Sequence, residues 1–137
     1  MYLSRLHISK FRVFDDITLY FKNGINILIG ENNSGKTAII DALRICLGCG
    51  KPDNFIYVQD GDLHVNPENP SEINTVIQFD LIFEFGDASI ERECFYDFIS
   101  QDKDNPDKQT IQLHLKFIQE NNGKKKYFKR IIWGGDN

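Results

Sequence analysis

The stretch GENNSGKT, residues 30–37, constrains the fold of this 137-residue chain more than any other segment. It matches the pattern G-x-x-x-x-G-K-[ST], which needs a strand before it and a helix after it. The preceding run INILIG is almost continuously apolar and predicts a strand buried on both faces. Gly48 and Gly50 predict the end of the following helix. Within that helix, apolar residues recur at helical spacing: Ile39, Ile40, Leu43, Cys46 and Leu47.

Each residue type in such a loop has a chemical role. Gly30 and Gly35 let the backbone turn tightly, so that its N–H groups point at phosphate oxygens. Lys36 reaches the β- and γ-phosphates, and the Thr37 hydroxyl is a ligand for Mg²⁺. The N-terminus of the helix adds partial positive charge. We therefore predict a nucleotide phosphate site, in preference to a glycine-rich turn with an incidental lysine.

The organisation of the chain falls into three parts. Residues 1–50 form the P-loop core, in which 6–21 predict two short strands with a break at Asp15-Asp16. Residues 51–71 are an irregular, proline-rich connection. Residues 72–137 form a β subdomain.

Alternation of apolar and polar residues defines the β subdomain. It predicts strands over 72–85 and 110–119, with a short helix over 88–100 between them. Asn122-Gly123 is a strong hairpin signal, and 127–133 is the returning strand.

Hydrolysis of a nucleotide would need an acidic residue on a neighbouring strand. Asp80 and Glu84 are candidates for the metal-binding acid and the base, but they alternate with the apolar residues of their strand. A Walker B strand is a buried, continuously apolar run instead. We therefore favour a solvated sheet face for Asp80, and expect a phosphate cradle without its catalytic acid.

Composition narrows the class of protein. The net charge of −4 argues against a generally basic nucleic-acid-binding domain. No run is long enough to span a membrane and the N-terminus has no signal-peptide core, so we expect a cytoplasmic protein. Cys46 and Cys49 form a lone C-x-x-C, and with Cys94 they are interpreted as reduced thiols rather than metal ligands.

The first fifty residues, from LHISKFRVFDD to ALRICLG, resemble the N-terminus of ABC-type ATPases of the RecF, SMC and OLD (overcoming lysogenization defect) group. Members of that group begin with a strand, an NFR.F-like turn, a second strand and G.N.SGKT. Lys10-Phe11-Arg12 stands at the turn here, with Lys10 in place of the usual Asn. The segment DLHVNPENPSEINTVIQFDLIFEF is similar to the one that follows the first helix in OLD-family ATP-dependent endonucleases.

The resemblance implies an α/β fold: the N-terminal lobe of a P-loop ABC-type ATPase, with a mixed sheet, one main helix after the loop and an antiparallel β subdomain. It also implies ATP and Mg²⁺ as ligands, with Thr37 on the metal and Lys36 as the catalytic residue. Arg12 would lie near the nucleotide, although a surface arginine in a hairpin is an equal alternative. The candidate nucleotide-binding residues are Gly30, Asn32, Asn33, Ser34, Gly35, Lys36, Thr37, Ala38 and Arg12.

Relatives of this kind continue with a Q-loop, an ABC signature, Walker B and a His switch, and OLD members add a Toprim nuclease domain. None of these is visible here, so we expect the ATP-binding lobe of an OLD-like DNA endonuclease in anti-phage defence or DNA repair. The resemblance further implies a homodimer or higher oligomer through the ATPase domain, DNA as a partner of the full-length protein, and a possible defence-system subunit.

Other functions remain as alternatives. One is a non-enzymatic regulatory fragment that binds nucleotide, and another is a RecF/SMC-like repair ATPase without a nuclease. A small kinase or GTPase is disfavoured, because antiparallel strands follow the helix and no NKxD-like motif is present. The basic cluster around 124–130 could touch a DNA backbone, but we favour a solvated hairpin tip.

Overall fold

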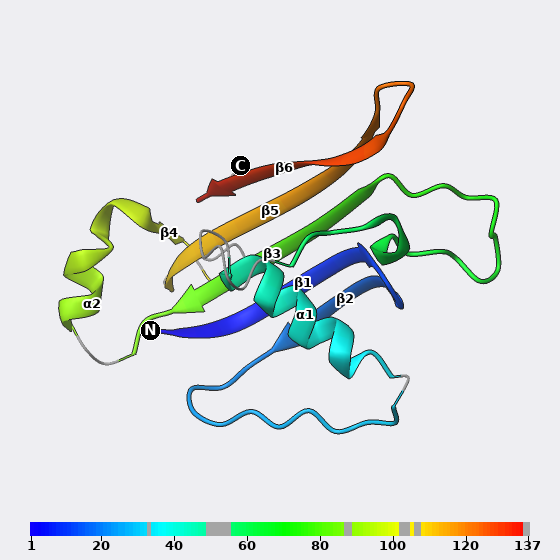
Figure 1. The fold of residues 1–137 in the computed structure, drawn as a ribbon. Helices are drawn as coiled ribbons and strands as arrows, with labels where there is room; N and C mark the ends of the chain where they lie inside the picture. The colour runs from blue at the N-terminus through cyan, green and yellow to red at the C-terminus, as the bar shows by residue number, and fades with distance from the viewer. Residues whose placement is uncertain (33, 49–55, 87–88, 102–104, 106–107, 136–137) are drawn as a thin grey trace.

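The computed structural model describes the chain except for residues 33, 49–55, 87–88, 102–104, 106–107 and 136–137 (Figure 1). A six-stranded sheet dominates it, with one longer helix and short helical turns. The strands are β1 (Tyr2–Phe11), β2 (Phe14–Tyr20), β3 (Val76–Glu84), β4 (Ile99–Gln101), β5 (Gln109–Asn121) and β6 (Lys126–Gly134). The helices are α1 (Lys36–Leu47) and α2 (Ser89–Cys94), with 3₁₀ turns at Asp60–Asp62 and Tyr96–Phe98.

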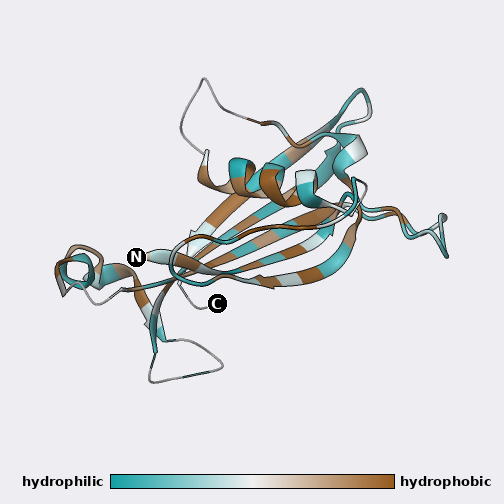
Figure 2. Cartoon of the chain, turned by 90° about the horizontal axis from the view of Figure 1, so that it is seen from below, coloured by the Kyte–Doolittle hydropathy of each residue, from teal (hydrophilic) through white to brown (hydrophobic). Residues whose placement is uncertain are grey.

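The strands run in the order β2-β1-β3-β5-β4. Strand β6 also pairs with β5, outside this path. Every pairing among these strands is antiparallel. Helix α1 crosses one face of the sheet, as the two perpendicular views agree (Figures 1 and 2). The predicted α/β lobe, with one main helix after the loop and an antiparallel β subdomain, is confirmed, whereas the described sheet is antiparallel throughout instead of mixed.

The core lies between α1 and the covered face of the sheet. Alternate residues of the central strands point into it, as period-two alternation requires. Buried side chains from β1, β3 and β5 meet buried side chains of α1 there. They include Leu6, Ile8, Phe11, Ile77, Phe79, Leu81, Leu115 and Phe117 from the strands, and Ala38, Ile39, Ala42, Ile45 and Cys46 from α1.

Helix α1 ends where the sequence predicts, because the N–H of Gly48 donates to the Arg44 carbonyl oxygen at 2.9 Å. Its apolar stripe differs from the predicted one, however. Ile40 and Leu47 are 48% and 54% exposed, whereas Ala42 takes a core position. Small side chains at Ala38 and Ala42 let the helix lie close to the sheet. The predicted stop at Gly50 lies outside the described residues.

The first hairpin turns earlier than predicted. The turn is Arg12-Val13, between the paired residues Phe11 and Phe14, and Asp15-Asp16 belong to β2. The cause is a distant segment, residues 59–64, which bonds to this turn. The N–H of Arg12 donates to the Asp62 carbonyl oxygen at 2.8 Å, and the N–H of His64 donates to the Lys10 carbonyl oxygen at 3.0 Å.

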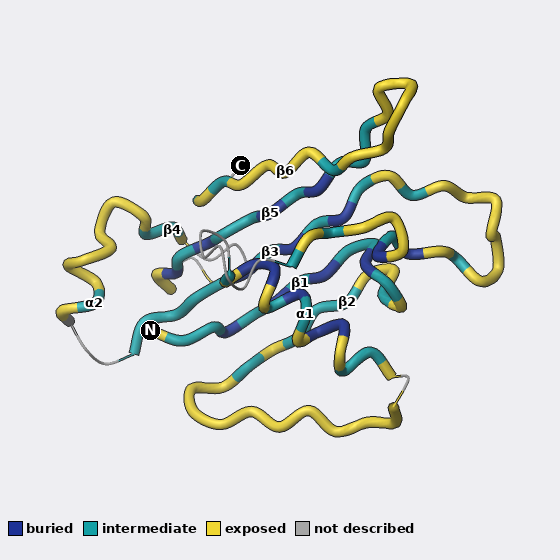
Figure 3. Tube along the Cα trace, in the orientation of Figure 1, coloured by how far each residue is buried: buried dark blue, intermediate teal, exposed yellow. Residues whose placement is uncertain are grey.

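The prediction that INILIG forms a buried strand is wrong for this structure. Residues 25–30 have no regular structure, and Ile25, Ile27 and Ile29 are 92%, 77% and 91% exposed (Figure 3). A strand needs a neighbour to pair its backbone groups. Within the described part of the chain, no strand pairs with this segment.

Candidate functional site

The phosphate loop lies where an irregular chain becomes a helix. Helix α1 begins at Lys36, and Gly35 caps it with φ of +92°, a left-handed conformation that favours glycine. Ser34 tightens the loop before it, because its N–H and its Oγ both donate to the Glu31 carbonyl oxygen, at 3.1 and 2.7 Å. The loop therefore turns into a helix as the motif predicts, but the residues before it, 25–30, do not form the predicted strand.

Both motif glycines occupy positions where a side chain would collide. A Cβ on Gly35 would lie 2.4 Å from Cζ of Phe14 and 2.9 Å from Cγ2 of Val13. A Cβ on Gly30 would lie 2.5 Å from Oγ of Ser34. The turn of the first hairpin therefore packs directly on the phosphate loop, and the missing side chain of Gly35 is what permits the contact.

The first turn of α1 offers hydrogen-bond donors to an anion. The first intrahelical bond runs from the N–H of Ile39 to the Gly35 carbonyl oxygen, at 3.0 Å, and Gly35 supplies no side-chain cap. The preceding helical N–H groups are thus available for a ligand, as at any helix N-terminus. The Lys36 ammonium reaches back over the loop and donates to the Gly30 carbonyl oxygen.

A cavity of about 380 Å³ lies beside the loop. It brings together predicted site residues from three places in the sequence: the hairpin turn, the loop and the start of α1. Ala38 is only 4% exposed, whereas Thr37 is exposed. The residues that line the cavity are Arg12, Val13, Asn32, Gly35, Thr37 and Ala38. Gly30, Ser34 and Lys36 belong to the loop but not to this lining, and Asn33 lies outside the described residues.

Arg12 is held at the cavity by two carboxylates. Its Nε donates to Asp62 Oδ1 at 2.8 Å, and its Nη1 donates to Asp41 Oδ2 at 2.6 Å. His64 Nδ1 donates to the Arg12 carbonyl oxygen at 2.8 Å. Burial, the largest influence, lowers the pKa of the guanidinium, but its hydrogen bonds to Asp62 and Asp41 outweigh burial and raise the pKa overall. Arg12 is therefore a fixed cation beside the loop.

The motif gives no sign of Asp41, Asp62 and His64, which sequence reasoning missed. Asp41 stands on the α1 surface, and Asp62 and His64 fall in the segment predicted to be irregular. Only the folded chain brings them to Arg12, 29 to 52 residues away along the sequence.

Asp80 is separated from the loop by the sheet. Its neighbours Phe79 and Leu81 are in the core under α1, so Asp80 points to the opposite face. There its Oδ2 accepts from His7 Nδ1 at 2.8 Å, and its Oδ1 accepts from His114 Nδ1 at 2.5 Å. This placement agrees with the interpretation that Asp80 is not a metal ligand of the phosphate loop.

The other sequence candidates also lie away from the loop cavity. Cys46 is buried in α1 and Cys94 is exposed, neither of them in a disulfide, and Cys49 is outside the described residues. No group of His, Cys, Asp and Glu that could hold a metal ion exists among the described residues. The lysines at 124–126 are exposed at the tip of the β5–β6 hairpin.

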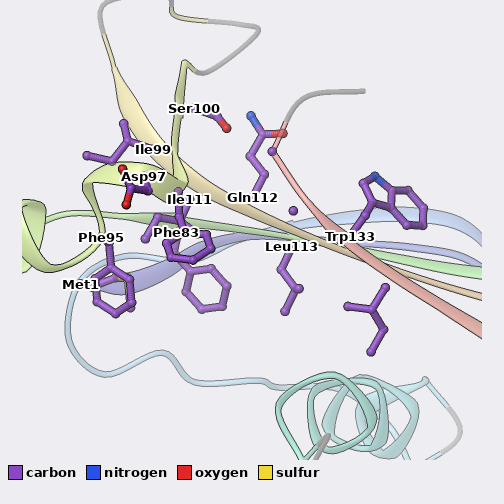
Figure 4. Close-up of a pocket in the computed structure, with 14 residues that line it drawn as sticks. Met1, Phe83, Phe95, Asp97, Ile99, Ser100, Ile111, Gln112, Leu113 and Trp133 are labelled. Carbon is purple, nitrogen blue, oxygen red and sulfur yellow. The ribbon is translucent and has the colours of Figure 1, made fainter.

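A second, apolar cavity of about 530 Å³ lies at the other end of the sheet, where β4 and β6 both border β5. Leu113 points to the side of the sheet where α1 lies, and Trp133 points to the other side (Figure 4). The Trp133 indole stacks on His114, with ring centroids 5.1 Å apart. Asp97, Ser100 and Gln112 are among the few polar residues at its wall. This cavity shares no lining residue with the phosphate loop.

The sheet, the helix after a G-x-x-x-x-G-K-T loop and the hairpin packed on that loop define the N-terminal lobe of an ABC-type P-loop ATPase fold. Residues 5–134 match the profile of the AAA domain family, and the chain belongs to that family. A solved SMC ATPase structure, from work on ATP-driven dimerization and DNA-stimulated activation, superposes with a TM-score of 0.58 at 15% identity. The match covers 95% of this chain and 69% of that one.

Two groups of curated relatives, RecF proteins and Rad50 ATPases, are similar to about a third of the chain. The DNA replication and repair protein RecF of Limosilactobacillus reuteri (strain DSM 20016) is 42% identical over 45 residues. The DNA double-strand break repair Rad50 ATPase of Thermoplasma volcanium is 40% identical over 47 residues. These matches span 33% and 34% of this chain, but only 12% of that RecF and 5% of that Rad50.

No helix in the described part of the chain combines the length and apolar character that crossing a bilayer requires.

Proposed function

We propose that this chain is the ATP-binding N-terminal lobe of a DNA-processing ATPase, and that it binds ATP with Mg²⁺ at Gly30–Thr37. The observation that carries the proposal is the packing of the hairpin turn on Gly35, beside a cavity lined by Arg12 and Thr37. A loop kept only as a connection would have no need of that contact.

The residues of the loop fit a triphosphate. Available N–H groups in the first turn of α1 suit phosphate oxygens, and the Lys36 ammonium already lies over the loop, on the Gly30 carbonyl oxygen. The exposed Thr37 hydroxyl suits Mg²⁺, which would neutralise phosphate charge when bound. We assign Asn32, Asn33, Ser34 and the Ala38 backbone to phosphate binding on the motif alone. Arg12 adds a cation from the hairpin.

The domain division is part of the proposal. Residues 1–50 would be the P-loop core, 51–71 the connection and 72–137 the β subdomain, with the rest of the ATPase domain supplied by further segments. The exposed apolar run at 25–29 supports this, because it has the composition of a central strand and no pairing partner in the described structure. Such a lobe, lacking a Walker B acid, should bind nucleotide with little turnover.

The activity of the whole protein follows two candidate paths. OLD-like ATP-dependent DNA cleavage, in anti-phage defence or repair, is supported by the sequence resemblance over residues 62–85. A RecF/SMC-like repair ATPase without nuclease is supported by the RecF and Rad50 relatives. In either case we propose a dimer or higher oligomer with DNA as a partner, in keeping with the SMC ATPase whose fold it shares. An additional defence-system subunit belongs to the first path alone.

Calorimetry with Mg-ATP tests the nucleotide site, with phosphate release followed in parallel. We expect the chain to bind Mg-ATP with negligible turnover, and Lys36→Ala to weaken binding by at least about tenfold, since a charge-assisted bond is lost. Lys124→Ala is the matched control, an exposed lysine on the distant hairpin tip, and should bind like the wild type.

Two results would overturn the proposal. Equal binding by wild type and Lys36→Ala would remove the loop as the site, and brisk hydrolysis by the chain alone would mean that a catalytic acid is present. Incubation of plasmid DNA with the longer protein, Mg²⁺ and ATP separates the two paths. Nicked or linear products support the endonuclease, and intact plasmid with ATP turnover supports the repair ATPase.

A further inference from the structure

Two carboxylates, Asp62 and Asp41, contact the Arg12 guanidinium. Asp62 is 8% exposed, and both of its carboxylate oxygens are used. Oδ1 accepts from Arg12 Nε at 2.8 Å, and Oδ2 accepts from the backbone N–H of Gln59 at 2.9 Å. Asp41 approaches from α1, and its other oxygen lies 3.6 Å from Arg44 Nη1. A buried carboxylate and a partly buried one, from separate elements, thus fix one side chain.

The Arg12 guanidinium has N–H donors that the two carboxylates do not bind. The carboxylates take Nε and Nη1, and no hydrogen bond within the described residues involves Nη2. The guanidinium carbon lies 4.9 Å from the centroid of the Phe11 ring, so the side chain is fixed by stacking as well as by charge. Because Arg12 lines the same cavity as Gly35 and Thr37, the free donors belong to a group already placed at the loop.

The 59–64 segment also holds the backbone of Arg12. A φ of +50° is unfavourable for a residue with a Cβ. The 59–64 segment compensates, because Asp62 and His64 bond the backbone N–H and carbonyl of Arg12. The segment therefore sets both the position of the turn and the direction of its side chain.

We propose that Asp62 and Asp41 are positioning residues, which hold the Arg12 guanidinium at the wall of the phosphate-loop cavity so that its remaining N–H donors bind a nucleotide phosphate. The inference rests on the nucleotide site proposed above. An arginine immobilised before binding loses little side-chain entropy when the phosphate arrives. The carboxylates would thus raise nucleotide affinity without touching the nucleotide.

A double-mutant cycle on Mg-ATP affinity tests whether Asp62 acts through Arg12. We expect Arg12→Ala to weaken binding by about tenfold, as the loss of a charge-assisted phosphate contact predicts. Asp62→Ala should weaken it by about three- to tenfold in the wild type, but should add nothing to Arg12→Ala. An equal effect of Asp62→Ala in both backgrounds, or no effect in either, would overturn the positioning role.

The controls separate this inference from the nucleotide site itself. Asp15→Asn removes a carboxylate three residues from Arg12, one that is paired with Lys10 instead, and should leave affinity unchanged. If Lys36→Ala weakens binding whereas the Arg12 and Asp62 variants do not, the site stands and the positioning role fails. If the wild-type chain binds no nucleotide, both fail together.

A readout without nucleotide guards against variants that do not fold. The Nε–H of Arg12 should give a protected ¹⁵N NMR signal in the ligand-free chain, because Asp62 Oδ1 accepts from it. Asp62→Asn and Asp41→Asn preserve side-chain shape and remove one charge each. We expect faster solvent exchange of that Nε–H in Asp62→Asn than in Asp41→Asn, since Asp41 contacts Nη1. Unchanged exchange in Asp62→Asn would contradict the proposal.

Discussion

Asp80 lies at the centre of a polar network on the face of the sheet that α1 does not cover. It accepts from His7 and His114, while His7 Nε2 also bonds Asp16 Oδ2 at 3.0 Å. Burial, the largest influence, raises the pKa of the Asp80 carboxyl, but hydrogen bonds from His114, His7 and Gln78 outweigh it and lower the pKa. Burial likewise lowers the pKa of His7, but Asp80 and Asp16 raise it overall.

These two shifts give the network a defined pH window. The lowered pKa of Asp80 contributes stability above the ordinary value of 3.8, and this is lost as pH falls through the folded-state pKa. The raised pKa of His7 contributes stability below 6.5, and this is lost as pH rises through the folded-state pKa. Both contributions are present together between 3.8 and 6.5.

We predict that Asp80→Asn lowers the free energy of unfolding by about 1–2 kcal/mol within that window, because a charged hydrogen-bond partner of His7 is lost. The difference from the wild type should shrink as pH rises above the His7 pKa. Urea unfolding followed by Trp133 fluorescence measures the stability, and an NMR titration should find a lower His7 pKa in the variant. Asp15→Asn is the control, and an unchanged His7 pKa in Asp80→Asn would contradict the prediction.

At the scale of elements, the spacing of apolar residues within a segment predicted several strands and the main helix. Alternation located β3 and β5, and helical spacing located α1, because each places its own apolar face in the core. The hairpin signal at Asn122-Gly123 located β6, which is mostly exposed. The loop followed from its motif. The turn at Arg12-Val13 did not, because it depends on bonds from residues 59–64, and the Asp62 and Asp41 contacts to Arg12 could not be predicted for the same reason.

The apolar run before the loop is the element in which pattern and structure disagree. We predict that Ile27→Thr changes the free energy of unfolding of this chain by less than about 0.5 kcal/mol, because Ile27 is 77% exposed. Ile8→Thr is the matched change in β1, where Ile8 is fully buried, and should cost about 2–4 kcal/mol. Urea unfolding measures both. A comparable loss in the two variants would mean that 25–29 is a buried strand after all.

At the scale of the whole molecule, charge is unevenly distributed. The chain carries a net charge of −4, yet three consecutive lysines stand exposed at the tip of the β5–β6 hairpin. The hairpin is well formed there, with Gly123 at φ of +83° and the N–H of Asn122 donating to the Lys125 carbonyl oxygen at 3.3 Å. The hairpin tip projects from the sheet (Figure 1), so its lysines offer a small basic area on a chain of net negative charge.

We predict that the chain binds duplex DNA only weakly, with Kd of about 10–100 µM at physiological salt, as nonspecific phosphate contacts allow. Replacement of Lys124, Lys125 and Lys126 by Gln should reduce the slope of log K against log salt by up to about 2.7, since each neutralised phosphate contributes about 0.9. Fluorescence anisotropy at several salt concentrations measures this slope. Gln at Lys10, Lys22 and Lys108 is the matched control, which removes the same charge elsewhere. An unchanged slope in the hairpin variant would place the DNA contact on another surface.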